Sequence, residues 1–305
     1  MARYIIKRVL QSIAVLLGVT AVVFFALNLT GDPVTFMFPI DTPIEVLEEY
    51  RRTSGMNDPI LIQYGRFLWD ALHGNFGTSH YYNQPAMQVV LERLPATLLL
   101  AITAFILALL IAIPTGIISA VKRNSVLDAI IRFFSMLGQC VPIFWLGLLL
   151  MLLFSVKLRL LPTFGASSWK HLIMPALTLA PGSAASFTRL IRSGMLDVLG
   201  QDYITVARAK GIHNGPLIMK HAFKNSLSSV LTVLGLQLAS LMGGSLITEN
   251  IFSWPGVGGL MYNSILNRDF MVVEAGVCLI ASFFVFINLA VDILYAAINP
   301  RIRFE

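Results

Sequence analysis

The sequence predicts an all-α integral membrane protein with six transmembrane helices. Of its 305 residues, 56% are apolar and 12% are charged, which is about half the charge of a typical soluble domain. The mean hydropathy is +0.76. Because lipid offers no hydrogen bonds to the backbone, apolar stretches of roughly 20 residues are expected to cross the membrane as helices. Six such stretches occur, at approximately 9–29, 96–121, 133–156, 171–190, 226–248 and 275–297.

The first stretch raises the question of a cleaved signal peptide. Residues 1–30 begin with Arg3, Lys7 and Arg8, as the basic start of a signal peptide does. The apolar run that follows is longer than the usual 7–15 residues, and no clean cleavage site follows it. We therefore expect a retained first helix rather than a signal peptide.

The charges of the connecting segments predict the orientation. Residues 189–224 hold six cations and two acids, a net charge of +4, whereas residues 30–94 hold four arginines and eight acids, a net charge of −4. The N-terminus, the loop near 122–132 and the C-terminus are also basic, although the predicted outer loop 157–170 is basic as well. By the positive-inside rule both termini are expected in the cytoplasm. The overall charge of +6 then reflects topology, and nucleic acid is not an expected partner.

The sequence divides into three parts: residues 1–94, 95–297 and 298–305. The first contains an extracytoplasmic insertion, in which Thr42-Pro43-Ile44-Glu45 predicts a capping box and a helix that ends at Gly55. A second helix is expected from Asp58-Pro59 to about Gly74, and a third apolar stripe leads into Pro95. These helices form either an amphipathic lid or a docking surface for an outside partner.

Prolines interrupt the apolar block that follows. They lie inside or at the ends of the expected helices, where proline kinks or breaks a helix, at Pro114, Pro142, Pro175 and Pro181. Irregular backbone at membrane depth is tolerated where protein covers it or where it lines a cavity. The prolines therefore favour a moving or water-lined assembly over a passive anchor.

A short basic segment between two apolar stretches predicts a surface helix. Asp202 is expected to be the N-cap, Arg208 and Lys210 fall in the last turn, where cations are favoured, and Gly211 suits the left-handed position after the helix. The segment lies between the charge-free runs 171–188 and 225–248. Such a helix, held against the membrane, offers another protein a surface to bind.

No catalytic or cofactor-binding pattern occurs in the chain. It has no G-x-x-x-x-G-K-[ST] for ATP phosphates, no H-E-x-x-H or paired-cysteine metal spacing, and no G-x-S-x-G. Cys140 and Cys278 both fall in or beside apolar stretches and imply neither a disulfide framework nor a metal site. We expect no enzyme and no bound cofactor or metal.

Asp292 is the clear ionisable residue inside an apolar stretch. A charge there is costly and is expected to be paired. Arg301 and Arg303 are close in sequence, which favours a structural ion pair over a proton relay. Secondary transporters usually need more intramembrane acids or broken-helix ion sites, so we expect the energy for any transport to come from elsewhere.

Small and uncharged polar residues interrupt the third and fifth stretches. They mark either close helix packing or the wall of a transport pathway whose side chains hold solutes only weakly. The candidates for the pathway are Gln139, Gln237, Ser240, Gly244 and Ser245.

The basic segment carries a resemblance to a known family. Thr205-Val206-Ala207 precede Gly211 at the spacing of the E-A-A-x-x-x-G signature of bacterial ATP-binding-cassette importers, with only the second alanine and the glycine matching. The version D-Y-x-x-x-A-R-A-K-G, from permeases of the peptide/nickel subfamily, is matched in full by Asp202, Tyr203, Ala207, Arg208, Ala209, Lys210 and Gly211.

Further matches to that subfamily follow in order over nearly the whole chain. They are Gly31-Asp32-Pro33, the segment from Gly55 to Pro59, Gln63-Tyr64, Asn75-Phe76-Gly77-Thr78-Ser79, Leu94-Pro95-Ala96-Thr97-Leu98, residues 249–258, Arg268-Asp269 and Asn299-Pro300-Arg301. The chain thus resembles a membrane-spanning permease subunit of a binding-protein-dependent importer of the bacterial inner membrane.

The resemblance implies a fold, a mechanism and partners. It implies the type I importer fold, in which the helix at 202–211 is the coupling helix that sits on a separate ATPase. Two such ATPases, which bind ATP and Mg²⁺, a second related permease and an extracytoplasmic substrate-binding protein would complete the complex, with residues 30–94 and 249–270 as candidate contacts outside. The cargo would be a peptide-like solute, with a nickel or other chelated-metal complex as the alternative. A self-contained secondary transporter and a purely structural subunit are the competing hypotheses.

Overall fold

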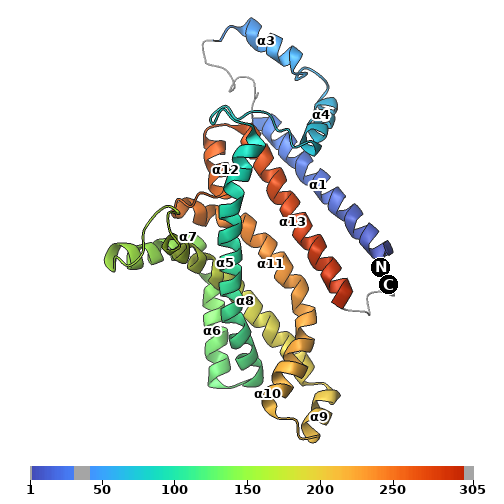
Figure 1. Cartoon of the computed structure of the whole chain (residues 1–305), viewed down its shortest axis with the longest axis vertical. Coiled ribbons are helices and arrows are strands. Elements are labelled where there is room, and N and C mark those ends of the chain that lie inside the picture. The colour runs from blue at the N-terminus through green and yellow to red at the C-terminus, as the bar shows by residue number, and fades with distance from the viewer. Residues whose placement is uncertain (1, 31–41, 299–305) are drawn as a thin grey trace.

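A computed structural model of the chain describes residues 2–30 and 42–298 (Figure 1). Within this part all regular structure is helical, apart from an isolated bridge between Thr78 and Pro85. The α-helices are α1 (Ala2–Thr30), α3 (Ile44–Thr53), α4 (Ile60–Leu72), α5 (Ala86–Val121), α6 (Val126–Cys140), α7 (Ile143–Leu150), α8 (Lys170–Leu199), α9 (Asp202–Ala209), α10 (Asn214–Pro216), α11 (Lys224–Ile251), α12 (Val257–Leu266) and α13 (Phe270–Ile298). There are also two π-helical segments. The first, η1 (Met151–Lys157), continues α7, and the second, η2 (Leu217–Phe223), precedes α11.

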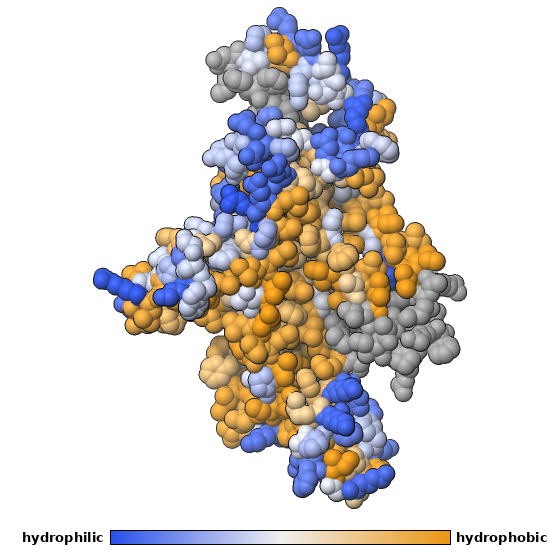
Figure 2. Space-filling model, in the orientation of Figure 1, coloured by the Kyte–Doolittle hydropathy of each residue, from blue (hydrophilic) through white to orange (hydrophobic). Residues whose placement is uncertain are grey.

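The bundle is elongated and has two different ends. Figure 1 shows α3, α4 and α12 toward one end, which we call the α12 end, and α9 and α10 at the other, the α9 end. On the face shown in Figure 2, hydrophobic residues cover the middle and hydrophilic residues gather at both ends. An apolar band between two polar ends is the surface of a protein that crosses a bilayer.

All six predicted stretches lie in helices, and five of them lie in one helix each. Three helical segments are long and apolar enough to span a membrane by themselves: Ile5–Ala26, Ala86–Val121 and Phe270–Ile293. The bent pair formed by α6 and the α7–η1 segment brings this number to four among the described residues. Helices α8 and α11 have 30 and 28 residues but a more mixed composition. The count of six spans and the cytoplasmic location of both termini remain predictions.

The third predicted span, 133–156, is wrong as a single helix. The α6 helix ends at Cys140, and the chain turns by 99° before α7 and η1 continue it. Val141 is extended, with φ −72° and ψ 122°, because the ring of Pro142 disfavours a helical conformation in the preceding residue. Pro142 therefore breaks its helix, whereas Pro114, Pro175 and Pro181 lie inside continuous helices.

The predicted insertion helices are present with shifted ends. Helix α3 begins one residue later than expected, with Pro43 in the N-cap position and no side-chain cap. The third apolar stripe is helical and leads into Pro95 as predicted, and the same helix, α5, runs on through this proline. The Nε2 of Gln63 closes the α3–α4 turn by donating to the carbonyls of Met56 and Asp58, both at 2.8 Å.

The N-terminal helix α1 is joined to the insertion by Tyr64, which follows Gln63 in the Gln63-Tyr64 motif. The Tyr64 hydroxyl donates to the carbonyl of Leu17 at 3.0 Å, and the ring of Phe67 packs at 5.5 Å from that of Phe24. These contacts fix α4 against α1. The motif Gly31-Asp32-Pro33 and the C-terminal residues 299–305 lie outside the described residues.

Three groups of buried side chains hold the bundle together. The group nearest the α9 end joins α5, α8, α9, η2 and α11 and includes Phe187, Ile191, Met195, Ile204 and Leu217. The middle group joins α5, α8 and α11 through residues such as Leu100, Leu179 and Leu241, and the third joins α5, α12 and α13. Helix α5 contributes to all three groups, so it forms the central column of the bundle.

Candidate functional site

Helix α9 is the surface helix that the basic segment predicts. It runs from Asp202 to Ala209, and the residue in the N-cap position is Gln201. The prediction that Asp202 is the N-cap is therefore wrong by one residue, although its carboxylate still lies in the first turn, where it favours the helix dipole. At the other end Gly211 has a φ of +82°, which confirms the predicted left-handed position.

One buried side chain anchors α9 to the bundle. Ile204 is 1% exposed and lies in the buried group that joins α5, α8 and η2. Tyr203 adds a polar contact, because its hydroxyl accepts a hydrogen bond at 2.9 Å from the Nδ2 of Asn225 at the start of α11. The helix is thus fixed to the two long helices before and after it in the chain.

The opposite face of α9 is open and carries small side chains. Val206 is 52% exposed, and Asp202, Thr205 and Ala209 are also exposed. Arg208 and Lys210 are exposed as well, whereas Ala207 is half-buried and packs against the group around Ile204. Val206, which the motif D-Y-x-x-x-A-R-A-K-G leaves unspecified, is the apolar residue at the centre of this open face.

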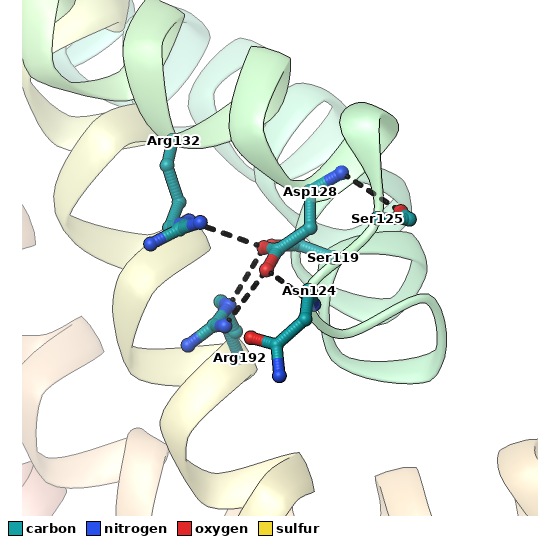
Figure 3. Close-up of polar contacts among 6 residues, drawn as sticks. All are labelled: Ser119, Asn124, Ser125, Asp128, Arg132 and Arg192. Carbon is teal, nitrogen blue, oxygen red and sulfur yellow. Dashed lines mark hydrogen bonds and ion pairs between the residues drawn. The ribbon is translucent and has the colours of Figure 1, made fainter.

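A buried ion pair joins α6 to α8, the helix that leads to α9 (Figure 3). Asp128 of α6 is fully buried, and its two oxygens accept from the Nε and Nη2 of Arg192 on α8, each at 3.0 Å. Ser119 of α5 and the backbone N–H of Asn124 also donate to this carboxylate. Asp128 therefore joins α5, α6 and α8 at one point. Sequence reasoning missed this role, because the residues lie in separate segments.

Three of the predicted pathway residues come together in one pocket. The pocket has a volume of about 400 Å³ and lies between α6, α8 and α11. Gln139, Gln237 and Ser240 line it, together with Thr178 and Ser183 of α8. The other two candidates are placed differently. The Ser245 side chain is buried and donates to Glu249, and Gly244 lies in α11, but its surroundings fall outside the described residues.

A second buried carboxylate organises the turn between α11 and α12. Glu249 is fully buried, and its Oε1 accepts from the hydroxyls of Thr97 at 2.8 Å and Ser245 at 2.9 Å. Its Oε2 accepts from the backbone N–H of Gly259 at 2.9 Å. A side chain at Gly256 would collide with this carboxylate. The glycines of the segment 249–258 thus leave room for a carboxylate that ties α5, α11 and α12 together.

Asp292 is paired, as predicted, but its observed partner comes from the other end of the chain. The Nη1 of Arg8 lies 3.1 Å from the Oδ2 of Asp292, where α1 runs beside α13. Arg301 and Arg303 lie outside the described residues. Asp292 is also not the sole acid inside an apolar helix, since Glu274 lies in the same helix, α13, one residue before the predicted stretch 275–297 begins.

Potential metal ligands do not cluster in the described part of the chain. No group of three or more His, Cys, Asp or Glu side chains is placed there to hold a metal ion. Cys140 is exposed and Cys278 is buried, and both are free. The chemistry of the polar residues described above is hydrogen bonding and charge pairing.

Comparison with known proteins agrees with this arrangement. Residues 112–304 match the family "Binding-protein-dependent transport system inner membrane component", and residues 1–103 match the N-terminal region described for the same kind of membrane component. Helix α5 runs across the boundary between the two matches.

Curated relatives match over the full length of both chains. The chain is 40% identical over 306 residues to the glutathione transport system permease protein GsiC of Salmonella paratyphi A, and equally to that of Escherichia coli K12. It is 42% identical over 316 residues to the oligopeptide transport system permease protein AppB of Bacillus subtilis. All these alignments cover 100% of this chain and of the relative.

Solved structures of importers share the fold. Two inward-facing structures of the MetNI methionine ABC transporter align with TM-scores of 0.58 and 0.61 at 18% and 17% identity. Each alignment covers 70% of this chain and 97% of the transporter chain. The architecture is thus the type I importer fold predicted from the sequence. The chain belongs to the family of binding-protein-dependent transport system inner membrane components, and it is a non-catalytic permease subunit of an ABC importer.

Proposed function

We propose that this chain forms one half of the pathway through which an ATP-driven importer carries a peptide-like solute, and that α9 couples it to a separate ATPase. The observation that carries the proposal is the geometry of α9. It is a short helix at one end of the bundle, anchored by Ile204 and open on the face that presents Val206 and Ala209. A small apolar face of this kind lets another protein approach the backbone closely.

The surroundings of α9 support a role in transmitting movement. Its anchor, Ile204, packs in the same buried group as Ile191 and Met195 of α8. Between these two residues on α8, Arg192 is paired with Asp128 of α6. A displacement of α9 would therefore move α8 and α6 together. These helices line the pocket that holds Gln139, Gln237 and Ser240, so closure of the ATPases can switch the pathway between inward-open and outward-open states.

The charge at the α9 end supports its cytoplasmic location. Residues 189–224 carry a net charge of +4, and basic loops stay in the cytoplasm. Both chain termini are then cytoplasmic as well, and α3, α4 and α12 lie outside, where a substrate-binding protein delivers the cargo. Arg208 and Lys210 flank the open face of α9 and suit an acidic rim on the ATPase.

The proposed complex contains two ATPase subunits, a second related permease and a binding protein, in contact with membrane lipid. ATP and Mg²⁺ bind to the ATPases rather than to this chain. The relatives that transport glutathione or oligopeptides favour a peptide-like cargo. The neutral amides and hydroxyls of the pocket between α6, α8 and α11 suit such a solute, because they offer hydrogen bonds without trapping it.

The test compares one substitution on α9 with one on η2 in the reconstituted importer. Val206→Glu changes the centre of the open face, and we expect it to lower ATP-driven uptake of glutathione or trialanine at least 10-fold while this chain stays folded in the membrane. Met219→Glu is the control, because Met219 is 51% exposed on the neighbouring η2 and lies off this face. Normal uptake by the α9 variant, with all subunits present, would overturn the coupling role.

A further inference from the structure

One face of α8 leads from the pocket to the guanidinium of Arg189. Gly182 and Ser183 line the pocket between α6, α8 and α11, and Ser186 and Arg189 follow at spacings of three residues. Residues three and four apart lie on the same face of a helix. With a rise of 1.5 Å per residue, Arg189 lies about 9 Å farther along α8 than Ser183. The direction is toward α9.

The guanidinium of Arg189 is held in place by the pocket wall. Its Nη1 donates to the Oε1 of Gln139, and the Nε2 of Gln139 donates to the Ser186 hydroxyl at 2.9 Å. Gln139 therefore accepts a hydrogen bond from Arg189 with its carbonyl oxygen and donates one to Ser186 with its amide nitrogen. The bond to Gln139 occupies one of the five N–H donors of an arginine, so most of the guanidinium remains available.

Two arginines on neighbouring turns of α8 have opposite surroundings. Arg192 is neutralised by the buried carboxylate of Asp128. Arg189 is exposed, and no acidic group lies within ion-pair distance of it in the segments 2–30 and 42–298. The side chains that give the pocket its polarity are neutral: Gln139, Thr178, Ser183, Gln237 and Ser240. Arg189 is therefore the charge that sets the electrostatic preference of this wall.

We propose that Arg189 binds a carboxylate of the passing solute and makes this half of the pathway selective for anionic groups. The planar fork of arginine matches a carboxylate in a two-point contact. Solvent exposure keeps such a contact weak, so a solute is oriented and released rather than trapped. The inference deepens the proposed function and rests on it for the nature of the cargo, although the charge of the pocket wall can be measured without any cargo.

The direct test measures the electrostatic preference of the pocket by thiol labelling. Ser240→Cys places a thiol in the pocket, and Cys140→Ala removes the exposed natural thiol, while Cys278 is buried. The assembled complex is treated with an anionic and a cationic methanethiosulfonate reagent of similar size. Mass spectrometry of this chain then gives the ratio of the two modification rates at position 240.

The expected result depends on Arg189 and not on the net charge of the chain. Arg189→Gln should lower the anionic-to-cationic rate ratio about 3- to 10-fold, the size expected for one charge acting over a distance on the order of 10 Å near water. Arg123→Gln removes the same charge from the exposed α5–α6 loop and should change the ratio less than about 2-fold. An equal ratio in all three proteins would overturn the proposal.

A transport measurement then asks whether the cargo senses this charge. With the binding protein saturated with trialanine, Arg189→Gln should lower uptake about 5-fold or more relative to Arg123→Gln, and Arg189→Lys should retain an intermediate rate because it keeps the charge without the fork. Unchanged uptake in Arg189→Gln would contradict the binding of a solute carboxylate by Arg189. Failure of the unmodified importer to take up trialanine or glutathione would instead count against the peptide-like cargo, while the labelling ratio would still decide the charge of the wall.

Discussion

Arg192 and Asp128 form a two-point ion pair between α8 and α6, with both N–O distances at 3.0 Å. The carboxylate is fully buried and is reached by donors from three separate segments of the chain. Removing one partner of such a pair leaves a buried charge without compensation. The pair lies between the pocket and α9, so it can hold these helices together while they move.

The first prediction concerns the stability of this ion pair. Asp128→Ala is expected to lower the free energy of unfolding by about 3 kcal/mol, because Arg192 loses its partner. Arg132→Gln is the control. Arg132 lies 3.5 Å from the same carboxylate but is 55% exposed, so its loss should cost less than about 1 kcal/mol. Thermal unfolding of the detergent-purified variants measures the stability that each substitution costs. Equal losses of stability in the two variants would contradict the role of Arg192 as the main partner of Asp128.

The second prediction concerns the carboxylate of Glu249. Gly256→Ala places a methyl group against this carboxylate, so the α11–α12 turn must shift and the protein should lose about 2 kcal/mol or more of stability. Gly243→Ala on α11 is the matched control, because a methyl group there meets nothing within 4 Å and should be neutral or slightly stabilising. Melting temperatures of the two purified variants give the comparison. A Gly256 variant as stable as the control would show that the turn tolerates displacement.

The third prediction concerns the end of α9. Gly211 has a φ of +82°, and an alanine in this conformation costs about 1–2 kcal/mol. Gly211→Ala should therefore fray the last turn of α9 and lower uptake per ATP hydrolysed several-fold. Gly215→Ala serves as the control, since Gly215 has open space around it and no positive φ. Parallel assays of uptake and ATP hydrolysis distinguish uncoupling from a general loss of activity.

The fourth prediction separates the importer from a secondary transporter. Asp292 is paired with Arg8 at 3.1 Å, so its role is expected to be structural. Asp292→Asn should keep ATP-driven uptake within about 2-fold, because the asparagine oxygen can still accept a hydrogen bond from Arg8. Uptake is measured in proteoliposomes with and without a proton gradient. Uptake that depends on the gradient and disappears in the Asn variant would favour a proton relay.

The sequence was informative where a local pattern determines the structure. Helix α9 was placed to within one residue, because a helix in water ends where a glycine can adopt a left-handed conformation. The apolar stretches located all the long helices for a similar reason, since hydropathy is a property of consecutive residues. The N-cap of α9 was missed by one residue because Gln201 has the extended backbone that Asp202 was expected to have.

The sequence was less informative where distant segments meet. Asp128 and Glu249 were not singled out, because their donors come from other helices, and only the folded chain shows that they are buried. A kink or break at Pro142 was expected, but so was one at three other prolines that lie inside continuous helices, so the residue type alone does not identify which proline breaks its helix. Among the pathway candidates, Gln139 and Gln237 line one pocket from two helices, whereas Ser245 donates a hydrogen bond to Glu249.

Site-specific cross-linking from α9 is the measurement that tests the central claim most directly. Ala209→Cys, in a Cys140→Ala background, places a thiol on the open face of α9, and Asn263→Cys places one on α12 at the other end of the bundle. Complexes purified gently from membranes are treated with a short thiol-to-amine cross-linker and identified by mass spectrometry. We predict an adduct between position 209 and a P-loop ATPase, and no ATPase adduct from position 263. No adduct from position 209, in a preparation that retains the ATPase, would contradict coupling through α9.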